Sequence, residues 1–104
     1  MGKRMNLTYA TGMVLQAIDV GFCYGFDVMD ASGLPDGTVY PALRRLEAAG
    51  LLTARWEDDA AAEKEKRPPR RYYELTPAGH EKLVEARARV RGLEVMIQPA
   101  RGAS

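Results

Sequence analysis

The chain has 104 residues and a formal net charge of +1 at pH 7, which is enough for one small domain with a modest core. Because the charge is so close to zero, net charge gives no support to nucleic-acid binding, and any such function must rest on where the charges lie. Its single cysteine, Cys23, excludes an internal disulfide framework. No apolar run approaches the roughly 18 residues of a membrane-spanning helix. We expect a soluble, cytoplasmic protein without a signal peptide or a membrane partner.

Two short helices are predicted at the start of the chain. Residues 1–7 form a polar lead that we expect to be mobile. Thr8 is a suitable N-cap for a first helix of about 12 residues that ends at Gly21. A second helix is predicted from Tyr24 to Ser32, followed by a tight turn over residues 33–35. The buried edge of the second helix is expected to consist of Phe22, Phe26 and Met29, which are spaced by four and three residues.

The third helix carries most of the functional information. It is expected to begin near Asp36 and to end at Gly50. One side is apolar and should face the core, formed by Val39, Ala42, Leu43 and Leu46. The opposite side combines small residues with hydrogen-bond donors, which suits close approach to DNA. Its candidate DNA-binding residues are Thr38, Tyr40, Pro41, Arg44 and Arg45. The alternative is an ordinary surface helix with solvated arginines.

Pro41 constrains this third helix, because proline has no N–H to donate to the preceding turn. Either the helix begins as late as Thr38, or it bends at Pro41.

An antiparallel hairpin is predicted after Gly50, because two segments alternate between apolar and polar residues. The segments are LLTARWED and RRYYELT, and Trp56 is expected in the core of this hairpin. The polar residues 58–65 between them are expected to be a solvated, disordered part of a projecting wing. Residues 63–71 contain five basic and two acidic residues, a local charge of +3. We expect this basic part to contact phosphates through Lys66, Arg67, Arg70 and Arg71.

A long last helix is predicted over residues 77–97, because Thr76 is a good N-cap and Pro77 fits the first helical position. Its apolar residues follow at spacings of three, four, three and four, the seam of a helix that packs on another helix. In so small a protein we interpret this seam as a dimer contact rather than as core. The seam consists of Leu83, Ala86, Val90, Leu93 and Ile97. Residues 98–104 are expected to be a flexible tail.

Together these elements predict a mainly α fold with a small β-hairpin. Residues 8–76 form a winged helix-turn-helix of three helices plus a two-stranded wing, followed by a C-terminal dimerisation helix. A homodimer would place two recognition helices about 34 Å apart and would bind double-stranded DNA at a near-palindromic site. One His, one Cys and two Ser offer no pairing of nucleophile and base, so we expect no enzyme activity, cofactor or metal. The alternative function is a winged-helix protein-interaction module without DNA binding.

The chain also resembles the PadR family of bacterial transcriptional regulators, from about Thr8 to Leu83. The motifs that carry the resemblance are YGF at 24–26, GTVYP at 37–41, LRRLE at 43–47, GL at 50–51 and RRYYELTPAG at 70–79. It implies a homodimeric regulator, usually a repressor, of the short form without a large C-terminal domain. The third helix would enter the major groove and the wing would touch the adjacent backbone. The acidic residues 57–59 depart from the family's usual basic wing.

The resemblance further implies a small aromatic or cationic effector bound at the dimer interface. Tyr9, Met13, Met96 and the last helix are then candidates for lining that space, and the alternative is that these residues simply fill the interface. Cys23 is interpreted as a small apolar residue rather than a redox switch, and His80 as a poor metal site. The operator, the target genes, the effector and the direction of regulation stay open at this stage.

Overall fold

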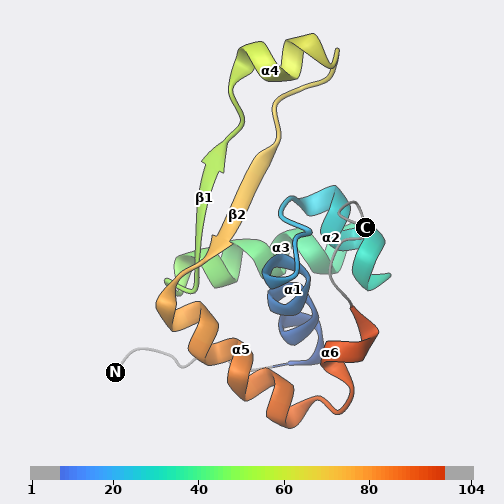
Figure 1. Cartoon of the computed structure of the whole chain (residues 1–104), viewed down its shortest axis with the longest axis vertical. Coiled ribbons are helices and arrows are strands. Elements are labelled where there is room, and N and C mark those ends of the chain that lie inside the picture. The colour runs from blue at the N-terminus through green and yellow to red at the C-terminus, as the bar shows by residue number, and fades with distance from the viewer. Residues whose placement is uncertain (1–7, 98–104) are drawn as a thin grey trace.

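The computed structural model describes residues 8–97, so the expected mobile lead and flexible tail lie outside the described residues. Helices form the body of the molecule, and a long hairpin projects from it with a short helix at its tip (Figure 1). None of the helices in residues 8–97 combines the length and apolarity needed to cross a membrane. In chain order the elements are α1 Tyr9–Asp19, α2 Gly25–Ser32, α3 Asp36–Ala48, β1 Leu52–Trp56, α4 Asp59–Lys64, β2 Arg71–Leu75, α5 Pro77–Arg89 and α6 Leu93–Met96.

Helix α1 lies at the centre of the core. The Thr8 side chain accepts a hydrogen bond from the Thr11 N–H in a capping box, which confirms the predicted start. Every residue from 11 to 18 is buried, because α2, α3, α5 and α6 all pack against this one helix. The apolar side predicted for α3 is confirmed, since Val39, Ala42, Leu43 and Leu46 are all buried.

The predicted buried edge of α2 is only partly correct, because Phe22 and Met29 are half-buried against the core but Phe26 faces out. Phe26 is 66% exposed, whereas Val28 and Gly25 are buried. Gly25 faces α3: a Cβ atom at Gly25 would lie only 2.4 Å from Cε1 of Tyr40, so a larger residue here would have to displace the Tyr40 ring. The neighbouring Phe26, about 100° further round the helix, consequently faces out.

Helix α3 runs without interruption from Asp36 to Ala48 with Pro41 inside it, so a start as late as Thr38 is wrong. Pro35, rather than Asp36, occupies the N-cap position. Pro41 removes the hydrogen bond to the carbonyl of Gly37, four residues earlier. Gly37 is exposed, so water can satisfy that carbonyl. Gly50 follows the helix with φ +80°, the left-handed residue that the sequence predicted.

The predicted hairpin is confirmed. Strands β1 and β2 pair antiparallel from Leu52 opposite Leu75 to Trp56 opposite Arg71. Its base joins the core through Leu52 and Tyr73, which are 2% and 8% exposed. Trp56 is 62% exposed, so its predicted place in a hairpin core is wrong. It lies at the far end of the strand, where the hairpin has left the helical body and no second layer covers it (Figure 1).

The wing tip is more ordered than predicted. Residues 59–64 form α4, and the side chain of Ala62 is only 1% exposed. The disordered loop expected over residues 58–65 is therefore wrong. Three consecutive alanines favour a helix. After this helix the chain turns back toward it, and the Arg67 N–H donates to the Ala62 carbonyl over 3.2 Å.

The single last helix expected over residues 77–97 is wrong in extent. Helix α5 ends at Arg89, Gly92 adopts φ +80°, and α6 begins at Leu93. This left-handed glycine reverses the chain, so that α6 folds back onto α1. The fit around position 12 is close, because a Cβ there would make ordinary van der Waals contact with Cβ of Ala86 at 3.4 Å and with Cδ2 of Leu93 at 3.7 Å.

As a consequence, the apolar seam of the last segment faces the core of its own chain. Exposed fractions are at most 2% for Leu83, Ala86, Leu93 and Ile97, and Val90 is half-buried. This corrects the expectation that the seam is a free dimer contact rather than core. Any contact between two copies of this conformation must use other side chains.

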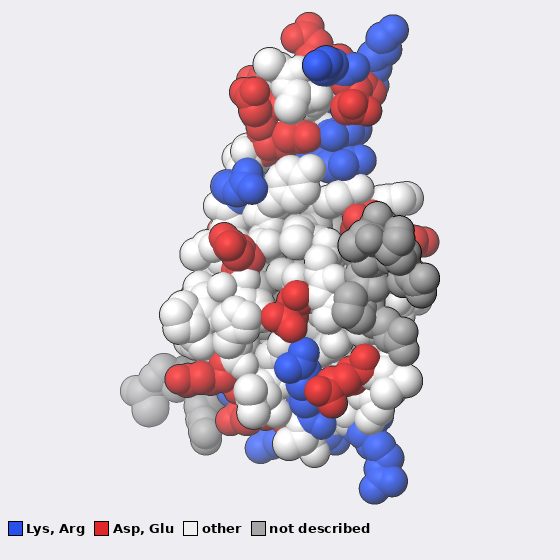
Figure 2. Space-filling model, in the orientation of Figure 1, with Lys and Arg blue, Asp and Glu red and all other residues white. Residues whose placement is uncertain are grey.

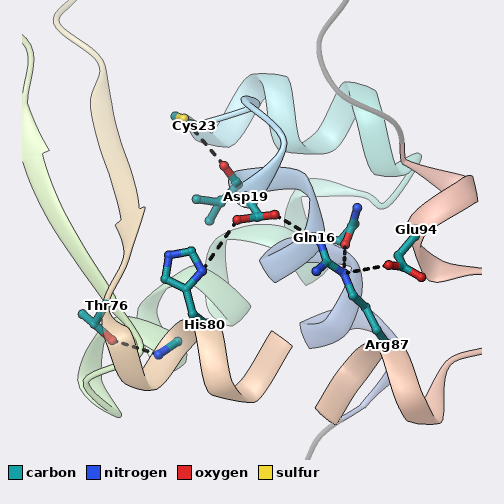
Figure 3. Close-up of polar contacts among 9 residues, drawn as sticks. Gln16, Asp19, Cys23, Thr76, His80, Arg87 and Glu94 are labelled. Carbon is teal, nitrogen blue, oxygen red and sulfur yellow. Dashed lines mark hydrogen bonds and ion pairs between the residues drawn. The ribbon is translucent and has the colours of Figure 1, made fainter. Parts of the chain in front are cut away.

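Polar side chains fix the C-terminal segment to α1 (Figure 3). The buried amide of Gln16 donates to the carbonyl of Ile97 over 3.1 Å and accepts from Nε of Arg87 over 3.0 Å. Arg87 also donates to Oδ2 of Asp19 over 3.1 Å. Because a buried amide without partners would be costly, these bonds favour the folded-back position of α6.

Candidate nucleic-acid interface

The outward side of α3 presents two free cations. Arg44 and Arg45 are exposed, and no ion pair or hydrogen bond of either guanidinium is found among residues 8–97. Tyr40 is 41% exposed on the same helix, while Thr38 and Pro41 are half-buried. A guanidinium without a protein partner can bind a phosphate or the edge of a guanine without first breaking an internal bond.

Two of the wing arginines are already paired within the protein. Arg67 forms a fork on Glu57, with Nη2 donating to Oε2 over 2.9 Å and Nη1 donating to Oε1. Arg71 donates from Nη2 to Oε2 of Glu47 over 3.0 Å. Both glutamates lie outside residues 63–71, so the local charge of +3 for that segment does not include them. The wing is therefore less basic than its sequence predicts, and Figure 2 shows acidic and basic side chains together on its projecting end.

The other two wing cations have no carboxylate partner among residues 8–97. Lys66 is exposed at φ +58° after α4. The Arg70 guanidinium lies over the Tyr24 ring, 4.1 Å from its centroid. The backbone N–H of Arg70 donates to Oε1 of Glu57 over 3.1 Å, which fixes the chain where it enters β2.

Glu57 gives the wing a pH dependence that can be measured. Hydrogen bonds from Arg67, together with the Arg70 N–H, lower the pKa of Glu57 from 4.5 to about 2. A carboxyl with a lowered pKa stabilises the folded state above its unfolded pKa, and that contribution disappears as the pH falls toward the folded value. We therefore expect the protection factors of the α4 amides, which compare observed with intrinsic exchange rates, to fall between about pH 4.5 and 2. In Glu57→Gln, the protection factors should already be low at neutral pH and should show no such step; an unchanged step would contradict this role.

The wing and the third helix meet at one groove. The Arg71–Glu47 ion pair links β2 to α3, and Tyr40, Arg70 and Arg71 line the same groove of about 720 Å³. The structure thus brings together three of the nine predicted DNA-binding residues. Arg44 and Arg45 lie further along α3, while Lys66 and Arg67 lie at the wing tip and border a separate hollow.

The candidate effector residues are only partly together. Oη of Tyr9 donates to Sδ of Met96 over 3.5 Å, and both side chains are about half exposed, at 51% and 46%. Met13 is 4% exposed and belongs to the core. Of the three predicted effector residues, only Tyr9 on α1 and Met96 on α6 lie together at the surface.

Sequence reasoning missed four residues of this region. Tyr24 and Phe26 line the groove from α2, and Trp56 lines it from β1. Glu57 organises the wing. The signal for Glu57 was present, because a glutamate and an arginine flank the wing tip. Phe26 and Trp56 were instead assigned to cores, and Tyr24 was marked only as part of the YGF motif at 24–26.

Cys23 and His80 have ordinary surroundings. Burial raises the pKa of the half-buried Cys23 thiol, which leaves less reactive thiolate at neutral pH. Nδ1 of His80 lies 3.7 Å from Oδ1 of Asp19 (Figure 3). In the part of the chain that the structure describes, no group of three or more His, Cys, Asp or Glu side chains could hold a metal ion.

Comparison with known proteins places this geometry in a family. Residues 14–85 match the model of the transcriptional regulator PadR-like family. A PadR-like transcription factor from Bacteroides fragilis is 30% identical, with a TM-score of 0.56 over 76% of this chain and 81% of that one. A PadR family regulator from Clostridium difficile has a TM-score of 0.68 at 23% identity, covering 79% and 86% of the two chains. No curated protein matches the sequence.

A third similar structure is BpsR of Bordetella bronchiseptica, whose DNA binding is regulated by 6-hydroxynicotinic acid. It is 27% identical with a TM-score of 0.65, over 94% of this chain and 66% of that one.

Proposed function

The chain belongs to the PadR-like family of transcriptional regulators, and on that premise we propose that it represses transcription as a homodimer bound to a near-palindromic operator. The observation that carries the proposal is the outward side of α3, where Arg44 and Arg45 are exposed without protein partners. A helix that follows a short helix and a tight turn, and that presents free guanidinium groups, suits the major groove.

In this proposal the contacts divide by type. Arg44 and Arg45 bind guanine edges or phosphates, because a guanidinium can donate two parallel hydrogen bonds to either. The hydroxyl groups of Thr38 and Tyr40 hold the sugar-phosphate backbone. On the wing, Lys66 and Arg70 take the adjacent phosphates. Arg67 and Arg71 contribute less, because Glu57 and Glu47 offset their charges.

The homodimer requires a contact other than the apolar seam. We propose the surface formed by the start of α1 and by α6, where Tyr9, Val95 and Met96 are 51%, 69% and 46% exposed. Exposed large apolar side chains that lie together commonly mark a protein contact. A small effector that changed this contact would alter the spacing of the two α3 helices; Tyr9 and Met96 would border its site.

Selection of fragments from the source genome tests the proposal. The purified chain is mixed with sheared genomic DNA at low salt, and bound fragments are sequenced with and without candidate ligands. Enrichment of a few fragments that share a near-palindromic sequence would support operator binding. Absence of bound DNA at low salt would contradict it and favour the alternative, a winged-helix interaction module.

The salt dependence of DNA binding distinguishes the wing cations that form no ion pair within the described residues, Lys66 and Arg70, from Arg71, which is paired with Glu47. Removing one phosphate contact lowers the slope of log affinity against log salt by about 1. We expect this change for Lys66→Ala and for Arg70→Ala in fluorescence anisotropy titrations, with sequence preference retained. Arg71→Ala should change the slope less. Arg89→Ala, an exposed arginine on α5, is the control; equal effects in all four variants would contradict the assignment.

A further inference from the structure

A shallow apolar hollow lies on the outward side of α2 and of the turn that follows this helix. Its volume is about 320 Å³, and its lining consists of Phe26, Met29, Asp30, Gly33 and Leu34. Phe26 is 66% exposed, whereas Met29 and Leu34 are half-buried against the core. A large apolar ring therefore faces water beside the hollow. We call these five residues, together with Asp27, the α2 face.

Backbone hydrogen bonds hold the α2 face in one shape. The Gly33 N–H donates to the Met29 carbonyl over 2.8 Å, and Gly33 ends the helix at φ +74°. The Leu34 N–H donates to Oγ of Ser32 over 3.2 Å. A Cβ at Gly33 would meet no atom of the described residues within 4 Å, so the turn is open to a partner. A surface that is already ordered loses little conformational entropy when a partner binds.

The electrostatics of the α2 face are unfavourable in the free chain. The chain contains 15 lysines and arginines, yet none lies between Thr8 and Leu43, where four aspartates occur. Asp30 lies in the last turn of α2, which carries no basic residue, although the negative end of the helix dipole disfavours a carboxylate there. Asp27, three residues earlier, adds repulsion between like charges.

Cations from outside the chain would relieve this repulsion. No ion pair of Asp27 or Asp30 is found within residues 8–97. Carboxylates beside an exposed aromatic ring are complementary to a surface that combines basic and apolar side chains. The α2 face thus fits a partner that supplies both.

The same charges disfavour three other occupants. The phosphates of DNA and anionic lipid headgroups would be repelled by Asp27 and Asp30. A second copy of the chain in a twofold contact would place the same aspartates against each other, because such a contact uses the same surface of both copies.

We propose that the α2 face docks a basic amphipathic helix of another protein, with an apolar side chain of that helix in the hollow beside Phe26 and its cations on Asp27 and Asp30. Docking of an amphipathic helix into an apolar groove is a common mode of protein recognition. The face lies on a different helix from Arg44 and Arg45, so a DNA-bound chain could hold such a partner beside its operator. This consequence rests on the proposed function, whereas docking itself does not.

The test uses a short helical peptide of leucine and lysine, with all its leucines on one side, as the probe. The matched control is the same peptide with glutamate in place of every lysine. Binding to the full chain is followed by ¹H–¹⁵N NMR. We expect the lysine peptide to shift the amide signals of residues 26–34 most, and to bind at least about tenfold more tightly than the glutamate peptide.

Three outcomes of this titration would overturn the proposal. They are no binding, equal binding of the two peptides, and shifts concentrated on other elements. Shifts of residues 26–34 on raising the protein concentration without peptide would also overturn it, because a second copy would then occupy the face.

Charge reversal at Asp30 distinguishes docking from a loss of folding. Asp30→Lys places a cation at the C-terminal end of α2, where the helix dipole favours it, so thermal unfolding should not occur at a lower temperature. We expect this variant to bind the lysine peptide at least about fivefold more weakly and the glutamate peptide more tightly than the original chain does. Asp59→Lys, at an exposed aspartate on the wing, is the matched control and should change neither affinity. Equal effects of the two reversals would overturn the assignment to α2.

Truncation of Phe26 tests the apolar part of the contact. Phe26→Ala should lower the affinity for the lysine peptide about tenfold without unfolding the chain, since Phe26 is exposed. Val84→Ala, which is similarly exposed at 65% on α5, should not change it. Full affinity in Phe26→Ala would overturn the proposal. Failure of the chain to bind DNA would leave these peptide measurements unaffected, so the two proposals can fail separately.

Discussion

A chain with alanine at both Arg44 and Arg45 is expected to bind its operator about 2 kcal/mol or more weakly, since each arginine that reads a base contributes about 1–3 kcal/mol. Both side chains are exposed and unpaired within the described residues, so their removal should leave thermal unfolding nearly unchanged. A gel-shift titration on a selected fragment measures the loss, which should be larger for the operator than for unrelated DNA.

The matched control replaces Arg89 and Arg91, a second pair of exposed arginines near the end of α5. This variant has the same net charge as the first. If both variants lose the same affinity, the loss reflects overall charge and not a surface on α3. If the α3 variant binds the operator as well as the original chain, α3 is not the recognition helix.

Replacing Leu93 with alanine is expected to lower the free energy of unfolding by about 2–5 kcal/mol, the usual cost of a cavity in a well-packed core. Leu93 is 1% exposed and lies on α6, which folds back onto α1. Urea unfolding measures the loss. Because the contact is within one chain, the loss should be the same at low and high protein concentration.

Val95→Ala is the control on the same helix, since Val95 is 69% exposed. It should change the free energy of unfolding by no more than about 0.5 kcal/mol when the chain is dilute. A loss for Leu93→Ala that vanishes on dilution would contradict the folded-back position of α6. It would mean that the apolar seam contacts a second copy, as the sequence alone predicted.

The features that were predicted correctly are those that depend on residues close together in the sequence. Thr8 and Thr76 cap the helices that they were expected to cap. The period of α3 identified its core side correctly, and alternation identified the hairpin. Each of these patterns depends on residues within a single helix or strand and its ends, so a short segment of the sequence is enough to predict the element and its buried side.

Features set by contacts between distant residues were not predictable in this way. Phe26 was placed in the core because its spacing fits, yet α2 packs on Tyr40 of α3 through Gly25, and Phe26 faces out. The seam of the last segment was read correctly as apolar, but its partner is α1 of the same chain, reached through the reversal at Gly92. Likewise, the pairing of Arg71 with Glu47 depends on how β2 returns to α3.

Site-directed photo-crosslinking tests most directly whether α3 and the wing bind one DNA duplex. A photoreactive amino acid is placed at Arg45 on α3, at Lys66 on the wing, or at Val84 on α5, and each chain is irradiated with a selected fragment. We expect crosslinks to the same short DNA segment from positions 45 and 66, and none from position 84. Crosslinks from position 84 alone, or from no position, would contradict it.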